Sequence, residues 1–121
     1  MKNIQTTYLI LILTIIISYS TSAESLDDSV SVTKTCRQLK ITNNSYQTIY
    51  IFAIEEKSAS LIEWSPSFDS PKIEKNRSLE IGYWEIVKKK RKLQKGDKII
   101  IFYWDDTYKT TSKVYHKIIA I

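Results

Sequence analysis

The chain has little of what cross-linked or metal-binding proteins depend on. Its 121 residues include one cysteine, one histidine, two glycines and two prolines. The lone cysteine, Cys36, allows no disulfide within the chain, so a folded domain must be held together by packing and hydrogen bonds. We expect Cys36 to be a reduced, partly buried thiol, although it also permits an intermolecular disulfide. The protein is therefore expected to be a monomer or a Cys36-linked dimer.

The same scarcity excludes several kinds of catalytic or cofactor site. One histidine, His116, and one cysteine are too few to complete the ligand set of a zinc or copper centre. The chain contains no Gly-x-Ser-x-Gly nucleophile motif and no glycine-rich phosphate loop. We therefore predict no catalytic residue, no metal site and no cofactor, and we expect His116 to be an ordinary residue of the last strand.

Carboxylates are the remaining groups that offer acid–base chemistry. A glycosidase needs two of them facing each other across a cleft, roughly 5–10 Å apart. The candidates flank tryptophans or lie in a turn, and they are Glu63, Glu85, Asp105 and Asp106. Nothing in their spacing predicts such a cleft, so a small hydrolase is the third of three functional hypotheses.

Only one long apolar run occurs, and it lies near the N-terminus. Residues 8–19 (YLILILTIIISY) follow the positively charged Lys2 and precede a stretch of small residues that ends at Ala23. This is the layout of a cleaved secretory signal peptide, and the run is shorter than the roughly 20 residues of a membrane-spanning helix. We expect residues 1–23 to be removed and the protein to be secreted or periplasmic.

Short segments of alternating apolar and polar residues fill the rest of the chain. After a polar leader over 24–35, which we expect to be flexible, strands are predicted over 39–41, 48–54, 61–64, 72–74, 78–87, 98–104 and 113–121. Segment 48–54 (TIYIFAI) is apolar on both faces, so it is expected in the middle of a sheet and in a hairpin with the strand before it. Gly82 is expected to mark a bulge.

About seven short strands with regular turn signals are typical of an all-β fold. We predict a small antiparallel β-sandwich, immunoglobulin-like or similar, over residues 36–121. Two glycines are few for a closed barrel, whose corners often need them. The sandwich is therefore preferred to the barrel.

Positive charge is concentrated in one predicted loop. The full chain has a net charge of +5, and six basic residues lie close together: Lys88, Lys89, Lys90, Arg91, Lys92 and Lys95. Clustered cations bind polyanions by releasing their counterions. The expected ligands are an acidic polysaccharide or an anionic membrane surface. A nuclear-import role is excluded by the export signal, no nucleic acid is expected, and a solvated hairpin tip is the structural alternative.

Two strands carry a near-repeat of aromatic residues on either side of this loop. The copies are 81–85 (IGYWE) and 101–105 (IFYWD). If both strands belong to one hairpin, an aromatic patch is expected from Tyr83, Trp84, Tyr103 and Trp104. The alternative is that these side chains fill the core of a small domain that has few leucines.

Two glycosylation sequons occur, at Asn43-Asn44-Ser45 and Asn76-Arg77-Ser78. Both fall in predicted turns, where an acceptor asparagine is accessible. They matter only if the protein passes through a eukaryotic secretory pathway.

The first functional hypothesis is an exported, non-enzymatic binding protein whose basic loop contacts an anionic ligand or surface. The second is an extracytoplasmic inhibitor or immunity-type protein, which would bind another protein instead. The sequence identifies neither ligand nor partner.

Overall fold

The computed structural model describes residues 26–88 and 92–121, and the structural statements below concern this part of the chain. It contains seven strands: β1 (Val30–Lys34), β2 (Gln38–Asn43), β3 (Ile49–Glu55), β4 (Lys72–Ile73), β5 (Arg77–Gly82), β6 (Lys98–Trp104) and β7 (Tyr115–Ala120). Four short helical segments accompany them: η1 (Leu26–Ser29), α2 (Glu56–Ala59), η2 (Tyr83–Glu85) and α3 (Tyr108–Thr111).

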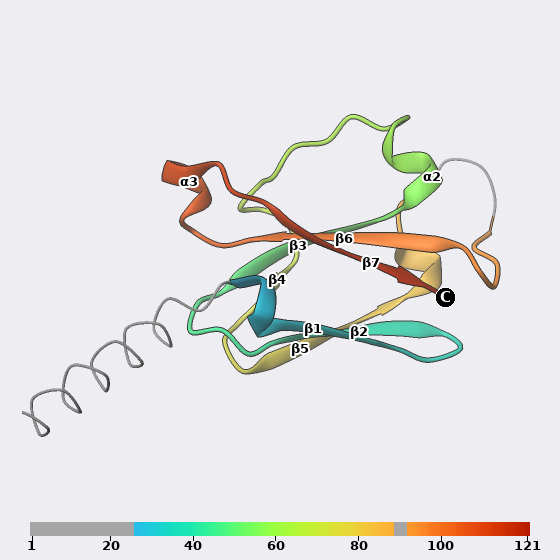
Figure 1. Cartoon of the computed structure of the whole chain (residues 1–121), viewed down its shortest axis with the longest axis horizontal. Coiled ribbons are helices and arrows are strands. Elements are labelled where there is room, and N and C mark those ends of the chain that lie inside the picture. Colours follow the sequence, from blue (N-terminus) through green and yellow to red (C-terminus); the bar gives the residue numbers. More distant parts are fainter. Residues whose placement is uncertain (1–25, 89–91) are drawn as a thin grey trace, which may run out of the picture.

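The strands form two antiparallel sheets arranged as two layers (Figure 1). One sheet has three strands in the order β1-β2-β5, and the other has four in the order β4-β3-β6-β7. The five pairings between the described strands are all antiparallel. The predicted all-β, sandwich-like architecture is therefore confirmed at this level.

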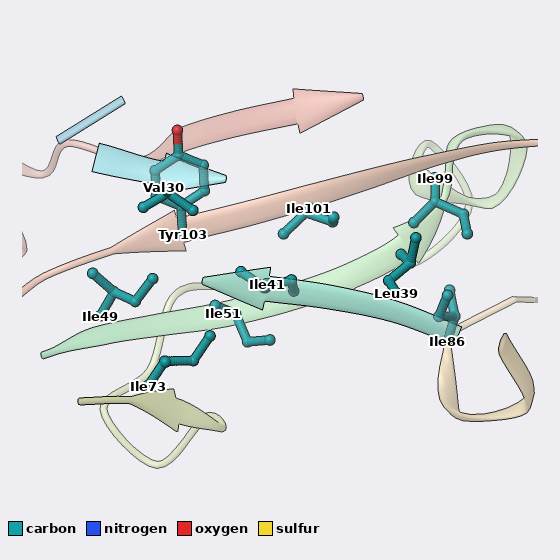
Figure 2. Packing of buried hydrophobic residues seen from close by; sticks show 10 residues of the cluster. All are labelled: Val30, Leu39, Ile41, Ile49, Ile51, Ile73, Ile86, Ile99, Ile101 and Tyr103. Carbon is teal, nitrogen blue, oxygen red and sulfur yellow. The ribbon is translucent and has the colours of Figure 1, made fainter. Parts of the chain in front are cut away.

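The inner faces of the two sheets pack against each other mainly through isoleucine (Figure 2). The three-stranded sheet contributes Val30, Leu39 and Ile41, and the four-stranded sheet contributes Ile49, Ile51, Ile99, Ile101 and Tyr103. Each of these side chains is almost completely buried. Burial of an aliphatic side chain of this size contributes about 1.5–3 kcal/mol, so this layer accounts for the cohesion of a domain without disulfides.

The central position predicted for segment 48–54 is confirmed, but its hairpin with the preceding strand is wrong. β3 lies between β4 and β6, whereas β2 pairs with β1 and β5 in the other sheet. The chain changes sheets just after Asn43, whose buried amide donates to the main-chain oxygens of Gln47 and Ile73 at 2.7 and 2.9 Å. Its Oδ1 accepts from the main-chain N–H and the hydroxyl of Ser45. These bonds fix the connection between the layers.

Two further sequence expectations need correction. Residues 30–34 of the supposedly flexible leader form β1, because Val30 and Val32 face the core and the main chain pairs with β2. Residues 61–64 form no strand; they belong to an irregular connection between α2 and β4. The expected edge strand at 72–74 is confirmed as β4.

The outer faces of the two sheets differ in character. On the three-stranded sheet the outward positions are polar, namely Ser31, Thr33, Lys40, Thr42, Ser78 and Glu80. On the four-stranded sheet the outward positions of β3 and β6 are aromatic or aliphatic, namely Tyr50, Phe52, Ile54, Ile100, Phe102 and Trp104. We call this second surface the aromatic face.

Candidate functional site

The basic loop does not join the two strands of a hairpin. β5, which precedes it, belongs to the three-stranded sheet, and β6, which follows it, belongs to the four-stranded sheet. The loop therefore crosses from one layer of the sandwich to the other, so it is not the tip of a hairpin. Of its six cations, Lys88, Lys92 and Lys95 are described, whereas Lys89, Lys90 and Arg91 lie outside the described residues.

Main-chain hydrogen bonds fix both ends of the crossing. Val87 donates to Ala53 O at 3.3 Å and accepts from Glu55 N–H at 2.9 Å, which ties the start of the loop to the end of β3. At the other end, Gly96 N–H donates to Ile121 O at 2.6 Å, and Ile121 N–H donates to Asp97 O at 2.9 Å. The described lysines of the loop are thus held at one end of the sandwich.

Three further cations, which the sequence reasoning missed, lie at this same end. The Lys34 ammonium donates to Ala120 O at 2.5 Å, and Ala120 pairs with Lys98 across β6 and β7. Arg37 lies in the β1–β2 turn, where its carbonyl accepts from Tyr83 N–H at 3.1 Å. We call this region the basic end; its described cations are Lys34, Arg37, Lys88, Lys92, Lys95 and Lys98. In Figure 1 it is the right-hand end, where the C-terminus is marked.

The missed cations had no signal in sequence spacing. Lys34 and Arg37 are separated from the loop by about fifty residues, and only the pairing of β2 with β5 brings the β1–β2 turn beside η2. Lys98 is the first residue of β6, a strand that its apolar residues predict, and the sequence therefore assigns this lysine to the strand and not to the loop. Their juxtaposition is a property of the topology.

Two carboxylates at the basic end accept hydrogen bonds from the main chain. Glu85 Oε2 accepts from Gly82 N–H at 2.8 Å, and Asp97 Oδ2 accepts from Gln94 N–H at 2.7 Å. Each therefore supports a local turn. Lys88 points back toward the chain, with its ammonium 3.5 Å from Trp84 O and 3.4 Å from Ile86 O. Lys92 and Lys95 are exposed.

η2 places one tryptophan on the surface of the basic end. The Trp84 side chain is 73% exposed. Its indole nevertheless lies against the main chain of Gly82. The contact is so close that a methyl group on Gly82 would overlap the ring carbons Cη2, Cζ3 and Cζ2. Gly82 has φ −67° and ψ 146°, a conformation that any residue adopts. The glycine is therefore needed for the space it leaves to the indole; it ends β5 and forms no bulge, contrary to the sequence expectation.

The neighbouring Tyr83 anchors η2 from the other side. Its hydroxyl donates to Thr35 O, and its main-chain N–H donates to Arg37 O. Burial raises the pKa of the Tyr83 phenol, and the nearby Cys36 raises it further. The phenol therefore remains a hydrogen-bond donor at neutral pH. Together with the Glu85–Gly82 bond, this contact holds the segment that carries Trp84.

The four aromatic residues expected in one patch are not brought together. Tyr103 points into the core between the sheets and Trp104 lies on the aromatic face, and neither is exposed. Trp84 and the half-buried Tyr83 are at the basic end. The patch prediction is wrong for Tyr103 and Trp104, because the two copies of the near-repeat belong to different sheets. For those two residues the core alternative holds.

The aromatic face is covered by the connection between α2 and β4. Trp64 stacks on Phe52 with centroids 4.6 Å apart and contacts Phe102 at 4.7 Å. Phe68 meets Tyr50 edge-on at 5.0 Å. A shallow hollow in this connection is lined by Ile62, Glu63, Trp64 and Ser65. The cover explains why an outward face so rich in rings is compatible with a small domain.

Trp104 lies beneath this cover. It is fully buried, and its indole Nε1 has no hydrogen-bond partner among the described residues. The Tyr50 ring stacks near it with centroids 6.4 Å apart.

The single cysteine and the single histidine are both on the surface. Cys36 is exposed in the β1–β2 turn of the basic end, so the expectation of a partly buried thiol is wrong. His116 is exposed on the outward side of β7, with its ring 6.1 Å from that of Phe102. A Cys36-linked dimer remains a prediction.

The candidate carboxylates lie at different places. Asp105 and Asp106 follow the end of β6, and Asp105 accepts from Thr107. Glu85 lies near the other end of β6. Val87, two residues further along the chain, forms a β-bridge with Ile54, and Ile54 pairs with Ile100 near the start of β6. Glu63 is exposed on the connection. Among the described residues, no three histidine, cysteine or acidic side chains gather as a metal site would require.

The two sequons differ sharply in accessibility. Asn43 is fully buried, and its amide group is engaged by the bonds given above. Asn76 is exposed, with φ 59°, in the turn before β5. Only Asn76 presents its side chain to a glycosyltransferase in the folded protein.

Comparison with known proteins adds no relative. No protein-family model, curated protein or solved structure matches the chain. Within the described residues, no helix has the length and apolar character needed to cross a membrane.

Proposed function

We propose that the protein is an exported, non-enzymatic binding protein that contacts an anionic ligand with its basic end. The observation that carries the proposal is the convergence of six described cations from four separate parts of the chain: the β1–β2 hairpin, the start of the crossing loop, its end, and β6. Clustered cations attract and retain a polyanion by releasing its counterions.

Exposure of the cations favours binding at this end. The Glu85 carboxylate is turned onto the main chain by the hydrogen bond from Gly82 N–H. The lysines Lys92 and Lys95 extend into solvent at the same end. A surface of this kind binds in a salt-sensitive way and discriminates mainly by charge density. Export, as expected from the N-terminal segment, restricts the anions to those found outside the cytoplasm.

Heparin-column retention tests the proposal with two charge-matched variants. The triple variant K88Q/K92Q/K95Q removes three cations from the basic end. The control K72Q/K75Q/R77Q removes three exposed cations from β4, from the turn that follows it and from the start of β5, so the net charge of the two proteins is equal. We expect the first variant to elute at much lower salt and the control to elute near the wild type. Equal elution of both variants would end the proposal.

A protein partner is the second candidate, and exposed Trp84 is the observation that favours it. Tryptophan is enriched at the centres of protein interfaces. An inhibitor or immunity-type complex would persist at high salt, where a polyanion complex dissociates. Pull-down in high salt with the wild type and Trp84→Ala separates the two candidates, because only a protein complex is retained there and lost in the variant.

A further inference from the structure

Trp84 is unusual among the three tryptophans because it is both exposed and fixed. Trp104 is buried and Trp64 packs over Phe52 and Phe102, whereas Trp84 has no aromatic neighbour among the described residues. An exposed side chain with no role in the core normally extends into solvent. Trp84 instead lies against Gly82 at a place where any larger residue would displace it.

The segment beneath the ring is held by three independent hydrogen bonds. Glu85 Oε2 accepts from Gly82 N–H, Tyr83 N–H donates to Arg37 O, and the Tyr83 hydroxyl donates to Thr35 O. An indole held in this way loses little conformational entropy when a second flat surface stacks on it. The end of β5, Gly82 and η2 thus hold the Trp84 indole as a flat surface on which a ligand can stack, which we call the platform.

One cation lies beside the platform. The Lys88 ammonium is 3.5 Å from the carbonyl oxygen of Trp84. A ligand that stacks on the indole therefore meets positive charge close to the segment that carries the ring. The two features together favour a ligand that combines a ring with negative charge.

We infer that Trp84, seated on Gly82, is a stacking platform for a sugar ring of an acidic oligosaccharide. A pyranose presents a flat array of C–H groups, which carry partial positive charge and pack on the electron-rich face of an indole. Its sulfate or carboxylate groups are then neutralised by Lys88 and the exposed lysines of the basic end. This inference rests on the proposed function and adds the ligand class: a glycan rather than a ring-free polyphosphate or a lipid surface.

The lipid alternative fits the position of the ring less well. A tryptophan that anchors a protein at a membrane interface projects from the surface so that its ring reaches the headgroup region. The benzene half of the Trp84 indole is instead folded back onto the main chain of β5. A ring in that position offers a face rather than an insertion edge.

The test measures affinity for three anions by titration calorimetry at one ionic strength. The probes are a heparin-derived hexasaccharide, a linear polyphosphate of similar charge, and vesicles of phosphatidylserine and phosphatidylcholine. We expect Trp84→Ala to bind the hexasaccharide roughly tenfold more weakly, the scale of stacking on an aromatic side chain, and to bind polyphosphate as the wild type does. Trp84→Tyr should retain most of the affinity.

Gly82→Ala is the sharper variant, because it keeps every cation and the tryptophan itself. The added methyl group meets only the far end of the indole, which can swing away, so the fold is expected to survive. Hexasaccharide affinity should fall nearly as far as in Trp84→Ala. Circular dichroism and increased iodide quenching of tryptophan fluorescence check that the domain is folded and that the ring has moved.

The possible outcomes separate this inference from the proposed function. Loss of hexasaccharide affinity alone in both variants supports the platform. Unchanged affinity for every probe, an equal loss for polyphosphate, or a loss for vesicles alone overturns it. The triple variant K88Q/K92Q/K95Q should weaken hexasaccharide and polyphosphate alike; if it weakens neither, the proposed function itself fails.

Discussion

The aromatic face and the basic end both carry tryptophan but place it in opposite environments. On the aromatic face, Trp64 covers Phe52 and Phe102, and Trp104 beneath them has no exposed area. At the basic end, Trp84 is supported from below by Gly82 and is otherwise open. Aromatic content alone therefore does not indicate a binding surface in this domain. A ring that is exposed and also held in place does.

The largest predicted effect separates the two regions by stability. Trp104→Ala removes a fully buried ring and should lower the free energy of unfolding by about 3–5 kcal/mol. Trp84→Ala removes an exposed ring and should change it by less than about 0.5 kcal/mol. Urea unfolding monitored by circular dichroism measures both. A large loss of stability in Trp84→Ala would show that this ring serves the fold and not a ligand.

A second effect concerns the end of the sandwich opposite the basic end. Asn43→Ala leaves the carbonyls of Gln47 and Ile73 and the N–H of Ser45 without their buried partner. We expect a loss of about 2–3 kcal/mol, with heparin retention at neutral pH unchanged. Asn44→Ala, at an exposed position, is the control and should be near neutral. If Asn43→Ala is equally harmless, the buried asparagine does not fix the crossing between the sheets.

The architecture was largely predictable because its strongest patterns are local. The apolar run within residues 98–104 (KIIIFYW) and the two-sided apolar segment 48–54 became β6 and β3, both interior strands of one sheet. Pairing partners were not predictable, since they depend on contacts between distant segments. The hairpin assigned to the second and third strands failed for this reason, as Asn43 turns the chain toward the other layer.

The candidate site was predictable only in its charge. The run of basic residues stands out in the sequence, whereas Lys34, Arg37 and Lys98 join it only through strand pairing. The near-repeat of aromatic residues was misleading, because identical residue types at 83–84 and 103–104 lie in different environments. Gly82 was noticed, but its role depends on the position of the Trp84 side chain, which no sequence pattern gives.

Alkaline pH is expected to lower the stability of the protein through one tyrosine in each region. Burial raises the pKa of both Tyr50 and Tyr83 above the usual 10.0, with smaller contributions from Asp106 and Cys36 respectively. The folded state thus favours the protonated phenols. The stability that the two phenols contribute to the folded state is complete below about pH 10. It is lost as the pH rises through their raised pKa values. Tyr83→Phe and Tyr50→Phe should each show a shallower decline of the urea midpoint above pH 10, and a decline identical to that of the wild type would contradict the assignment.

The smallest effect concerns Cys36, which is exposed among the cations of the basic end. A disulfide between two copies brings two positively charged surfaces together. We therefore expect oxidation to the dimer to be severalfold faster at high ionic strength than at low, because salt screens this repulsion. Non-reducing electrophoresis over time measures the rate, and Cys36→Ser is the control. A rate independent of salt would place Cys36 outside the field of the lysines.

The central claim is that the basic end, and no other surface, retains an anionic ligand. The most direct measurement is the dependence of heparin affinity on salt for the wild type, K88Q/K92Q/K95Q and K72Q/K75Q/R77Q. We expect the slope of log Kd against log salt to fall by about one for each lysine removed from the basic end and to be unchanged in the control. Equal slopes in the two variants would contradict it.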